Sequence, residues 1–330
     1  MIKSIEDANI KDDMRVLVRV DWNVPVGDPD VGGVREVLDA SRIEASFSTI
    51  NYIKKCGGRP IVMSHFGREG DSLEPVIDFA KKHYPVLTEG VEFLENLRKN
   101  PGEELNSEEF AKELASKADI YVNEAFSVSH REHASIVGVP KFIISYVGFH
   151  FLEEYQKLEE AFNPEHPFLF VLGGAKFETK LPLVQKFLNI ADDIFIGGAL
   201  AIRASEMSDS AGNPIADNPK IIFPIGDIKA LDANIETLET LRPKIKQAKF
   251  ILWNGPLGNY EKGFIAGTMA LARMLAQSEA KVIVGGGDTL AILKPDIKDE
   301  ISTHGFISTA GGAMLDFLAT GTLPGIEVLK

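Results

Sequence analysis

The sequence is poor in cysteine, in long apolar runs and in positive charge. Only one of its 330 residues is cysteine, Cys56, which excludes an internal disulfide and a cysteine metal cluster. No apolar stretch of about 18 residues and no basic segment leading into an apolar signal core is found, so we expect a cytoplasmic protein that does not interact with membranes. The formal net charge of −13 argues against general binding to nucleic acid or anionic membranes. An anionic substrate must therefore be held by local basic clusters.

Two common signatures of nucleotide enzymes are also missing. No segment fits the Gly-x-Gly-x-x-Gly fingerprint of nicotinamide dehydrogenases with its later acidic residue, and the Gly-x-x-x-x-Gly-Lys-Ser/Thr loop of P-loop kinases is absent. The overall composition, with 45% hydrophobic and 25% charged residues, is that of an ordinary globular protein. A chain of this length predicts two domains.

Glycine clusters are the most informative feature that is present. Five short apolar runs of the second half end in such clusters, at residues 168–176, 194–198, 250–256, 281–288 and 305–312. Such runs predict strands buried on both faces, and the helical patterns after most of them indicate a parallel sheet with crossover helices. Ligands bind at the carboxyl ends of such strands, where glycine exposes backbone N–H groups to phosphate oxygens. The second half is therefore predicted to bind a polyphosphate ligand.

The first half has strands that end in polar and basic residues instead. Strands are predicted at 15–20, 59–63 and 119–123, with helices at roughly 39–56, 73–83 and 107–117 between them. Residues 149–163 have apolar side chains at helical spacing and are predicted to form a bridging helix. The result is one domain with basic strand ends and one with glycine strand ends, joined by a helix.

This division suits phosphoryl transfer between a nucleotide and a small acidic substrate, because that reaction needs mainly alignment, charge neutralisation and exclusion of water. For each cationic side chain the alternative is a solvated surface charge. His65 and Arg68 lie in a glycine-containing turn after an apolar strand, and His130, Arg131 and His133 form a second compact basic group elsewhere in the sequence. The cationic candidates of the first half are Arg19, Arg42, His65, Arg68 and Arg131.

Short motifs of distinctive composition recur along the whole chain. They begin with Arg-Val-Asp-Trp-Asn-Val-Pro and lie at residues 19–25, 64–68, 94–98, 122–126, 130–133, 172–180, 253–256, 285–289 and 323–325. In content and order these motifs resemble those of the phosphoglycerate kinase family. The resemblance implies an α/β fold of two Rossmann-like three-layer αβα domains with mainly parallel sheets, a bridging helix and a hinge. It also implies reversible phosphoryl transfer between 1,3-bisphosphoglycerate and MgADP, giving 3-phosphoglycerate and MgATP. Direct in-line transfer without a phosphoenzyme is expected.

The resemblance also implies a domain organisation. Residues 1–150 match the domain that binds 3-phosphoglycerate, residues 151–163 the bridging helix, and residues 164–319 the nucleotide-binding domain. The tail, residues 320–330, is expected to pack back on the first domain. Because the family is commonly monomeric, we expect a monomer whose partners are small molecules.

On the substrate side, the resemblance implies six contacts. Asp21 and Asn23 match residues that contact the glycerate carboxylate and hydroxyl. Arg42 matches a catalytic arginine that reaches the transferring phosphoryl group, a task that suits the planar guanidinium. The residues that match the pocket for the other phosphate are His65, Arg68 and Arg131.

On the nucleotide side, Lys176 matches the lysine that follows the migrating phosphoryl group, and Lys180 matches one that contacts nucleotide phosphate. Their spacing places both on one face of a helix. The backbone N–H groups of Gly311 and Gly312 are expected to neutralise charge on the transferring group. The other matches to the nucleotide site are Gly173, Gly174, Gly197, Gly198, Asn254, Gly255, Pro256, Leu257, Glu261, Gly287, Asp288 and Thr289.

Within this set, Gly197 and Gly198 match the floor of the adenine cleft, and Thr289 is expected to help hold phosphate. Asp288 matches the carboxylate associated with magnesium, and an ordinary helix N-cap is its alternative. One protein carboxylate is sufficient for Mg²⁺ that arrives with ATP or ADP, because phosphate and water complete its coordination shell.

The chain departs from the family pattern at three places. His166 stands where an arginine of the phosphate pocket is expected, and Ala310 replaces the first glycine of a glycine motif, which costs about 1–2 kcal/mol if the position needs a positive φ. The chain is also short for the family, with segments missing between Arg68 and Leu94 and between Arg203 and Ile221. A non-catalytic nucleotide-binding relative is therefore the alternative to an active kinase.

Overall fold

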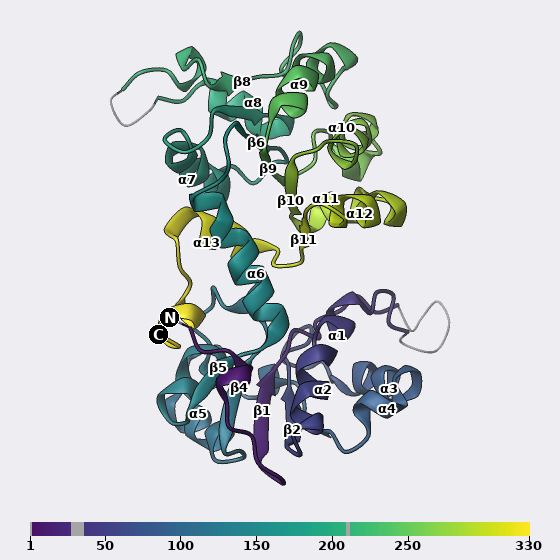
Figure 1. Ribbon diagram of the computed structural model, residues 1–330, viewed down its shortest axis with the longest axis vertical. Helices are drawn as coiled ribbons and strands as arrows, with labels where there is room; N and C mark the ends of the chain where they lie inside the picture. Colours follow the sequence, from purple (N-terminus) through teal and green to yellow (C-terminus); the bar gives the residue numbers. More distant parts are fainter. Residues whose placement is uncertain (1, 28–35, 209–211) are drawn as a thin grey trace. The chain divides into compact units, whose positions relative to one another are not determined.

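The computed structural model describes residues 2–27, 36–208 and 212–330, which form two compact units. One unit comprises Met1–Tyr155 with Thr322–Lys330, and the other comprises Gln156–Gly321. Each unit contains one parallel sheet with helices on both of its faces (Figure 1). The α/β fold class expected from the sequence is confirmed.

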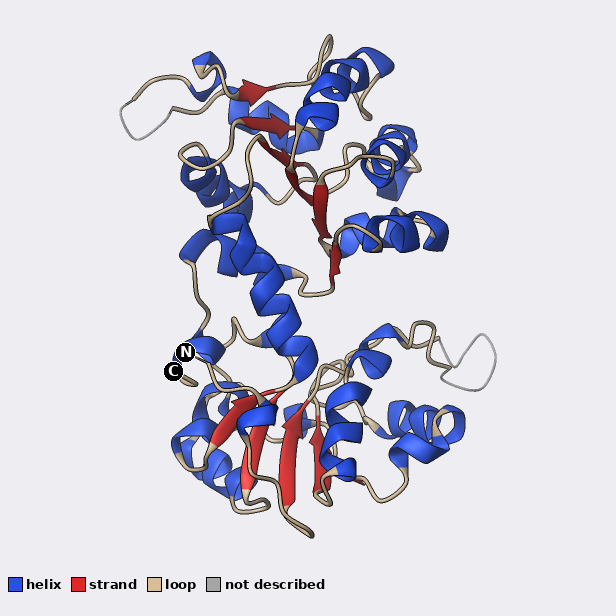
Figure 2. Cartoon of the chain, in the orientation of Figure 1, coloured by secondary structure: helices blue, strands red, loops and turns tan. Residues whose placement is uncertain are grey.

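The sheet of the first unit has the strand order β3-β2-β1-β4-β5, and every pairing in it is parallel. Figure 2 shows its strands in red with helices on both sides. The strands are β1 (Arg15–Arg19), β2 (Arg59–Met63), β3 (Glu92–Phe93), β4 (Ile120–Asn123) and β5 (Ser145–Val147). The helices are α1 (Ser41–Ala45), α2 (Phe47–Lys55), α3 (Glu74–His83), α4 (Pro85–Thr88), α5 (Glu108–Ala115) and α14 (Pro324–Glu327), and α6 (Phe149–Glu159) begins in this unit and continues into the other.

Side chains of β1 alternate between the two faces of this sheet. Val16 and Val18 join a core cluster with apolar residues of α2 and α3, whereas Leu17 joins one with residues of α5. Burial of both faces explains why these strands read as continuous apolar runs. Helix α5 begins at a capping residue: the Ser107 hydroxyl accepts the N–H of Phe110 and so satisfies a backbone donor of the first turn.

The sheet of the second unit has the order β11-β10-β9-β6-β7-β8, again with every pairing parallel. Its strands are β6 (Phe168–Leu172), β7 (Asp193–Ile196), β8 (Ile221–Ile222), β9 (Phe250–Asn254), β10 (Lys281–Gly285) and β11 (Phe306–Ser308). Its helices are α7 (Phe177–Phe187), α8 (Gly198–Ser205), α9 (Ile235–Gln247), α10 (Ala266–Ala276), α11 (Gly287–Ile292), α12 (Pro295–Ser302) and α13 (Gly312–Thr320). All five apolar runs that end in glycine are strands, as predicted.

Two segments connect the two units, helix α6 and the carboxyl-terminal tail. Helix α6 begins at Phe149 and ends at Glu159, and a 3₁₀ turn continues it over Glu160–Phe162. The carboxyl-terminal residues belong to the first unit, where the N–H of Gly325 donates to the carbonyl of Ser129 at 2.8 Å. A Cβ on Gly325 would lie 2.7 Å from the Cβ of Ser129, so the tail makes a close backbone contact that requires glycine.

Two local details of the structure differ from the sequence predictions. The helix predicted at 39–56 is two helices, α1 and α2, that meet at Ser46. The strands β3, β5 and β8 were not predicted, because each has only two or three residues and shows no alternation that could be read. Among the described residues, no helix is long and apolar enough to span a bilayer.

Candidate functional site

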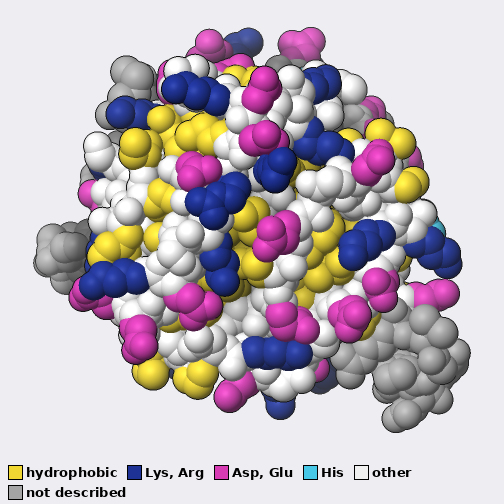
Figure 3. Space-filling model, turned by 90° about the horizontal axis from the view of Figure 1, so that it is seen from below, with side chains coloured by type: hydrophobic (Ala, Val, Ile, Leu, Met, Phe, Trp, Pro, Cys, Tyr) yellow, Lys and Arg dark blue, Asp and Glu magenta, His cyan; other side chains and the backbone are white. Residues whose placement is uncertain are grey.

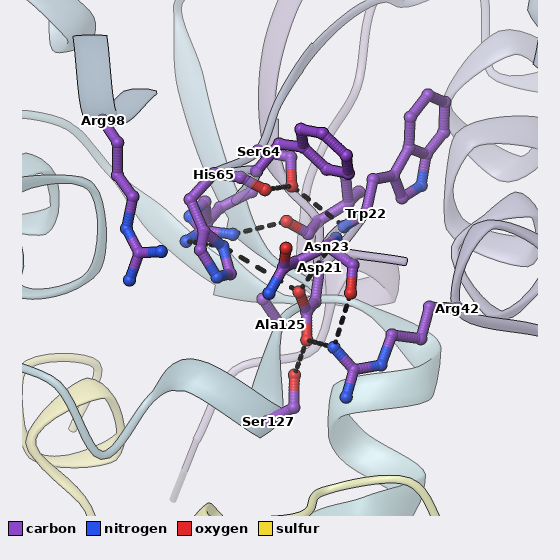
Figure 4. Close-up of polar contacts among 12 residues, drawn as sticks. Asp21, Trp22, Asn23, Arg42, Ser64, His65, Arg98, Ala125 and Ser127 are labelled. Carbon is purple, nitrogen blue, oxygen red and sulfur yellow. Dashed lines mark hydrogen bonds and ion pairs between the residues drawn. The ribbon is translucent and has the colours of Figure 1, made fainter. Parts of the chain in front are cut away.

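In the first unit, the carboxyl ends of β1, β2 and β4 bring polar side chains together around Asp21 (Figure 4). Arg42 Nη1 donates to Asp21 Oδ2 at 2.9 Å, and to the carbonyl of Asn23 at 3.1 Å. The Ser127 hydroxyl donates to the same carboxylate oxygen. His65 Nδ1 lies 3.9 Å from Asp21 Oδ1. The three strands thus assemble residues that are far apart in the sequence.

Electrostatics keep this pocket positive and its carboxylate ionised. Burial raises the pKa of Asp21, but the charge of Arg42, with the Ser127 hydroxyl and Arg19, outweighs it, so the pKa lies below its ordinary value. Burial and the adjacent Arg19 hold the pKa of His65 well below its ordinary value. His65 is therefore neutral near pH 7, and the cluster's charge comes from guanidinium groups.

The loop after β2 is held in place by Asn96. Its Nδ2 atom donates to the carbonyls of Phe66 (2.7 Å), Arg68 (3.1 Å) and Asp71 (2.7 Å), and its Oδ1 accepts the N–H of Phe66. Asn23 Oδ1 also accepts the N–H of Gly67 at 3.0 Å. These bonds fix the backbone of the turn, whereas the Arg68 side chain is exposed.

Arg98 belongs to the same cluster, although it was not among the predicted site residues. In Figure 4, Arg98 and Arg42 lie on opposite sides of His65 and Asp21. Arg98 Nη1 donates to the carbonyl of Gly67, and Arg98 and Arg68 line one cavity of about 490 Å³. The signal that could have revealed it is its place at the end of the matching motif 94–98.

Arg131 completes the cationic cluster, as was expected from the sequence. Burial, and then repulsion by Arg98, lowers its pKa from the ordinary value. Its Nη1 atom is buried and has no hydrogen-bond partner within the described chain. Two guanidiniums that repel each other, one with an unsatisfied buried nitrogen, form a site that favours a bound anion.

The contacts of His166 lie within the second unit. It stands two residues before β6, at the amino end of that strand, away from the glycine turn that follows the strand. Its Nδ1 lies 2.6 Å from Asp192 Oδ2, which also accepts the N–H of Phe168. The pairing with Asp192 gives His166 a local structural role, and the structure does not support the predicted place in the phosphate pocket.

The glycine turns of the second unit pack against one another at neighbouring strand ends. The N–H of Gly174 donates to the carbonyl of Pro256 at 2.7 Å, and the N–H of Gly173 donates to the carbonyl of Asn254 at 2.9 Å. Gly255 has φ 99°, and a Cβ there would lie 2.3 Å from the carbonyl oxygen of Gly173. Glycine is required because these backbones touch.

Lys180 is buried beneath these turns. Its Nζ donates to the carbonyl of Gly173 at 2.6 Å, and burial lowers its pKa to about 8. Lys176 is exposed and stands just before the first residue of α7, Phe177. The predicted sharing of one helix face is therefore wrong: Lys176 is the N-cap residue and is open to solvent, whereas Lys180 supports the turn.

Two more predicted residues lie where β9 and β10 end. Asp288, the second residue of α11, is half-buried, and its Oδ1 accepts the hydroxyl of Tyr260 at 3.0 Å. Its side chain makes no N-cap bond in α11. Thr289 is fully buried, and its hydroxyl accepts the N–H of Gly255 at 2.9 Å. Thr289 therefore joins two turns and does not present an open hydroxyl.

Three helices of the second unit begin at glycines that directly follow parallel strands: α8 at Gly198, α11 at Gly287 and α13 at Gly312. Their first N–H groups give the strand ends a positive field suited to phosphate. Gly311, the residue before α13, has φ 59°. Ala310 is not among the described residues with positive φ, so its replacement of glycine carries no strain of that kind.

The other residues predicted for the nucleotide site include Gly198, Leu257 and Glu261. Gly198 and Leu257 line a narrow cleft together with residues of segment 224–237. Leu257 is buried, and Glu261 is exposed in a 3₁₀ turn, Tyr260–Lys262. The cleft has a volume of only about 10 Å³, less than a nucleotide base needs, and Asp227, Asp232, Asn234 and Thr237 line it beside Leu257.

Positive charge is concentrated locally. Figure 3 shows the face below the first unit, where the described Lys and Arg side chains are intermixed with Asp and Glu. With a net charge of −13 over the whole chain, the cluster of Arg42, Arg98 and Arg131 is therefore a local feature.

Comparison with known proteins decides the family. The model of the phosphoglycerate kinase family matches residues 5–89, 76–215 and 205–321. A phosphoglycerate kinase of Finegoldia magna is 35% identical over 99% of this chain and 98% of its own length, and one of Francisella tularensis subsp. holarctica is 34% identical with the same coverage. The chain belongs to the phosphoglycerate kinase family.

Solved structures of phosphoglycerate kinases share the fold. The enzyme from Coxiella burnetii has a TM-score of 0.83 and 30% identity, covering 100% of this chain and 99% of that one. The enzyme from Pyrococcus horikoshii OT3 has a TM-score of 0.80 and 25% identity, covering 99% and 98%.

This member of the phosphoglycerate kinase family is short. Its alignment with the Finegoldia magna protein runs over 402 positions, more than the 330 residues of the chain, so gaps fall on this side. Part of the second segment thought to be shortened, residues 209–211, lies outside the described residues. The residues placed at the two strand-end sites are nevertheless all present.

Proposed function

We propose that the chain is an active phosphoglycerate kinase, which transfers a phosphoryl group reversibly between 1,3-bisphosphoglycerate and MgADP to give 3-phosphoglycerate and MgATP. The observation that carries the proposal is that a whole-chain family match coincides with two chemically complementary strand-end sites. One site is cationic, and the other consists of glycine turns and helix starts.

The first unit supplies the groups for the acidic substrate. Asp21 is assigned to accept a hydrogen bond from the glycerate hydroxyl, and the Asn23 amide to donate one to the glycerate carboxylate. We assign the phosphate that stays behind to His65, Arg68, Arg98 and Arg131, with Arg98 in the role that the sequence suggested for His166. The buried Nη1 of Arg131 supports this assignment, because an anion oxygen would satisfy it.

The second unit supplies the groups for the nucleotide. We assign the phosphates to the N–H groups at the starts of α11 and α13, and the base to the side of Gly197 and Gly198, which the resemblance matches to the adenine cleft. Lys176, which is exposed at the start of α7, is free to follow the phosphoryl group. Lys180 acts indirectly, through the turn at Gly173.

Magnesium enters as part of the nucleotide substrate. The described residues contain no group of three or more His, Cys, Asp or Glu side chains that could hold a metal by themselves. Asp288 alone fits a Mg²⁺ ion that phosphate oxygens and water coordinate on its other sides. Bound Mg²⁺ would neutralise charge on the nucleotide phosphates.

Transfer itself needs alignment and charge neutralisation. Arg42 from the first unit, with Lys176 and the N–H groups of Gly311 and Gly312 from the second, are assigned to the equatorial oxygens of the moving group. Because these groups belong to different units, we expect closure of the units to bring both substrates into line. A monomeric state and a cytoplasmic location remain predictions.

The test is a coupled assay of ATP-dependent consumption of 3-phosphoglycerate. We expect turnover for the natural sequence, and a loss of about 100-fold or more in kcat for Arg42→Ala and for Lys176→Ala, because each removes charge stabilisation from the transition state. Arg59→Ala is the matched control, since Arg59 is exposed and pairs with Asp13. Nucleotide binding without any turnover would identify a non-catalytic relative instead.

A further inference from the structure

A buried chain of polar side chains leads away from His65, behind the proposed substrate pocket. Arg19 Nη2 lies 3.2 Å from His65 Nδ1, and Arg19 Nε donates to the Ser135 hydroxyl at 3.0 Å. The Ser135 hydroxyl donates to Glu103 Oε1 at 2.6 Å, and the Ser135 N–H donates to Oε2 at 2.9 Å. Arg19, Ser135 and Glu103 are each 0% exposed, and His65 is 1% exposed.

The chemistry of the side chains determines which of them donate and which accept in this series of hydrogen bonds. A guanidinium has only donors, so the 3.2 Å contact is a hydrogen bond only when His65 Nδ1 accepts from Arg19 and carries no proton. The imidazole is then neutral with its single proton on Nε2. Burial and the charge of Arg19 both disfavour a second proton, which agrees with the lowered pKa of His65.

Glu103 supplies the charge that keeps Arg19 in place. Burial raises its pKa, but His133, Arg19 and Ser135 outweigh this, so the pKa lies below its ordinary value and the carboxylate is ionised. A buried guanidinium needs such a counter-charge, and Ser135 relays it because its hydroxyl accepts from Arg19 while donating to Glu103.

We propose that Glu103, Ser135 and Arg19 are positioning residues that hold His65 in the neutral form protonated at Nε2, so that His65 presents one fixed N–H donor to the substrate. Asp21, Arg98 and Arg131 are the other charged groups that act on His65. The expected effect on substrate binding rests on the proposed function, in which His65 lines the substrate pocket. The tautomer itself is a property of the free enzyme.

The reason for such a device is specificity for an anion in a crowded cationic site. A protonated His65 would lie against Arg19 and repel it, and a neutral ring protonated at Nδ1 would point its proton at a guanidinium. Only the form protonated at Nε2 satisfies Arg19 and leaves a donor for a phosphate or carboxylate oxygen. This relay of Glu103, Ser135 and Arg19 thus selects one tautomer of His65 and thereby fixes the direction of its hydrogen-bond donor.

The experiment is ¹⁵N NMR of histidine-labelled enzyme without substrate, between pH 5.5 and 8, with His65→Gln used to assign the ring. We expect His65 to stay neutral and protonated at Nε2 across this range. In Ser135→Ala we expect a mixture of tautomers or a ring that titrates. Because the fixed donor is lost, KM for 3-phosphoglycerate should rise about tenfold with kcat changed by about twofold or less.

Two variants separate positioning from simple stability. Tyr121→Phe removes another buried hydrogen bond to Ser135, from its hydroxyl to the Ser135 carbonyl (2.8 Å), without touching the relay, and should keep the wild-type His65 signal and KM. Ser135→Thr keeps the hydroxyl and should restore the signal. A wild-type ring protonated at Nδ1, or the same spectral change in Tyr121→Phe as in Ser135→Ala, overturns the proposal. A catalytically inactive enzyme with the expected tautomer would count against the proposed function alone.

Discussion

At the scale of single residues, the site depends on which charges are compensated. Arg42 is paired with Asp21, and Arg19 is balanced by Glu103 through Ser135. Arg131 retains a buried nitrogen without a partner in the described chain and lies in the field of Arg98. Arg98 is itself paired with the exposed Glu104 at 2.9 Å, so the charge that lacks a close partner is that of Arg131, beside which we place the phosphate.

Arg98 and His166 give the residue-scale prediction. Arg98→Ala should raise KM for 3-phosphoglycerate by about 10- to 100-fold, the loss typical of a charge-assisted hydrogen bond, with a smaller effect on kcat. His166→Ala is the comparison, because it removes a partly exposed ion pair with Asp192 and should leave that KM within about twofold. Steady-state kinetics at fixed MgATP measures both. The reverse ranking would restore the pocket role that the sequence suggested for His166.

At the scale of elements, helix α6 is anchored by a buried carboxyl from another segment. Glu124, just after β4, accepts the Thr49 hydroxyl at 2.6 Å and the N–H groups of His150 and Phe151 at 3.2 Å each. A Cβ on Gly148 would lie 2.0 Å from Glu124 Oε2, so glycine leaves room for the carboxyl at the helix start. Glu124 thus joins the end of β4 to the first turn of α6.

Burial raises the pKa of Glu124 to about 8, from an ordinary 4.5. Between these values the folded protein holds a proton that the unfolded chain has lost, so this contribution to stability is complete below pH 4.5 and is lost as pH rises through about 8. Glu124→Gln cannot ionise. The free energy of unfolding of wild type minus that of Glu124→Gln should fall by roughly 3–5 kcal/mol between pH 4.5 and 8.5.

Urea denaturation at several pH values measures this difference. Glu153→Gln, at an exposed position of the same helix, is the matched control and should show a pH-independent difference from wild type. A difference for Glu124→Gln that does not change with pH would show that Glu124 is ionised in the folded protein at neutral pH.

At the scale of the whole molecule, the groups proposed to be catalytic are divided between two units that the chain joins through α6 and the tail. The proposed reaction requires Arg42 of one unit and Lys176 of the other to act on the same phosphoryl group. We therefore predict that the radius of gyration decreases when MgADP and 3-phosphoglycerate bind together, and changes less with either alone.

Small-angle X-ray scattering measures this change directly. Arg59→Ala is again a suitable control, since its exposed ion pair with Asp13 lies outside both proposed sites. An unchanged radius with both ligands bound at saturation would contradict closure, while leaving the assignments within each unit intact.

The sequence alone determined the fold class, the strands of both sheets that carry the sites, and the glycine turns. Apolar runs such as those at β6 and β9 predict a strand buried on both faces from the local sequence alone. A glycine at the end of such a strand indicates that another backbone approaches closely there. Asp21, Arg42, His65 and Arg131 could be found because they lie in matching motifs directly beside such strands or helices.

Only the tertiary structure decided the partners of these residues. It added Arg98 to the cluster, paired His166 with Asp192, buried Lys180 under a turn, and built the relay from Glu103 through Ser135. The physical reason is that hydrogen bonds, burial and pKa shifts depend on groups that approach across the sheet. Periodicity along the chain records which face of an element is apolar, but it does not record which distant side chain meets it there.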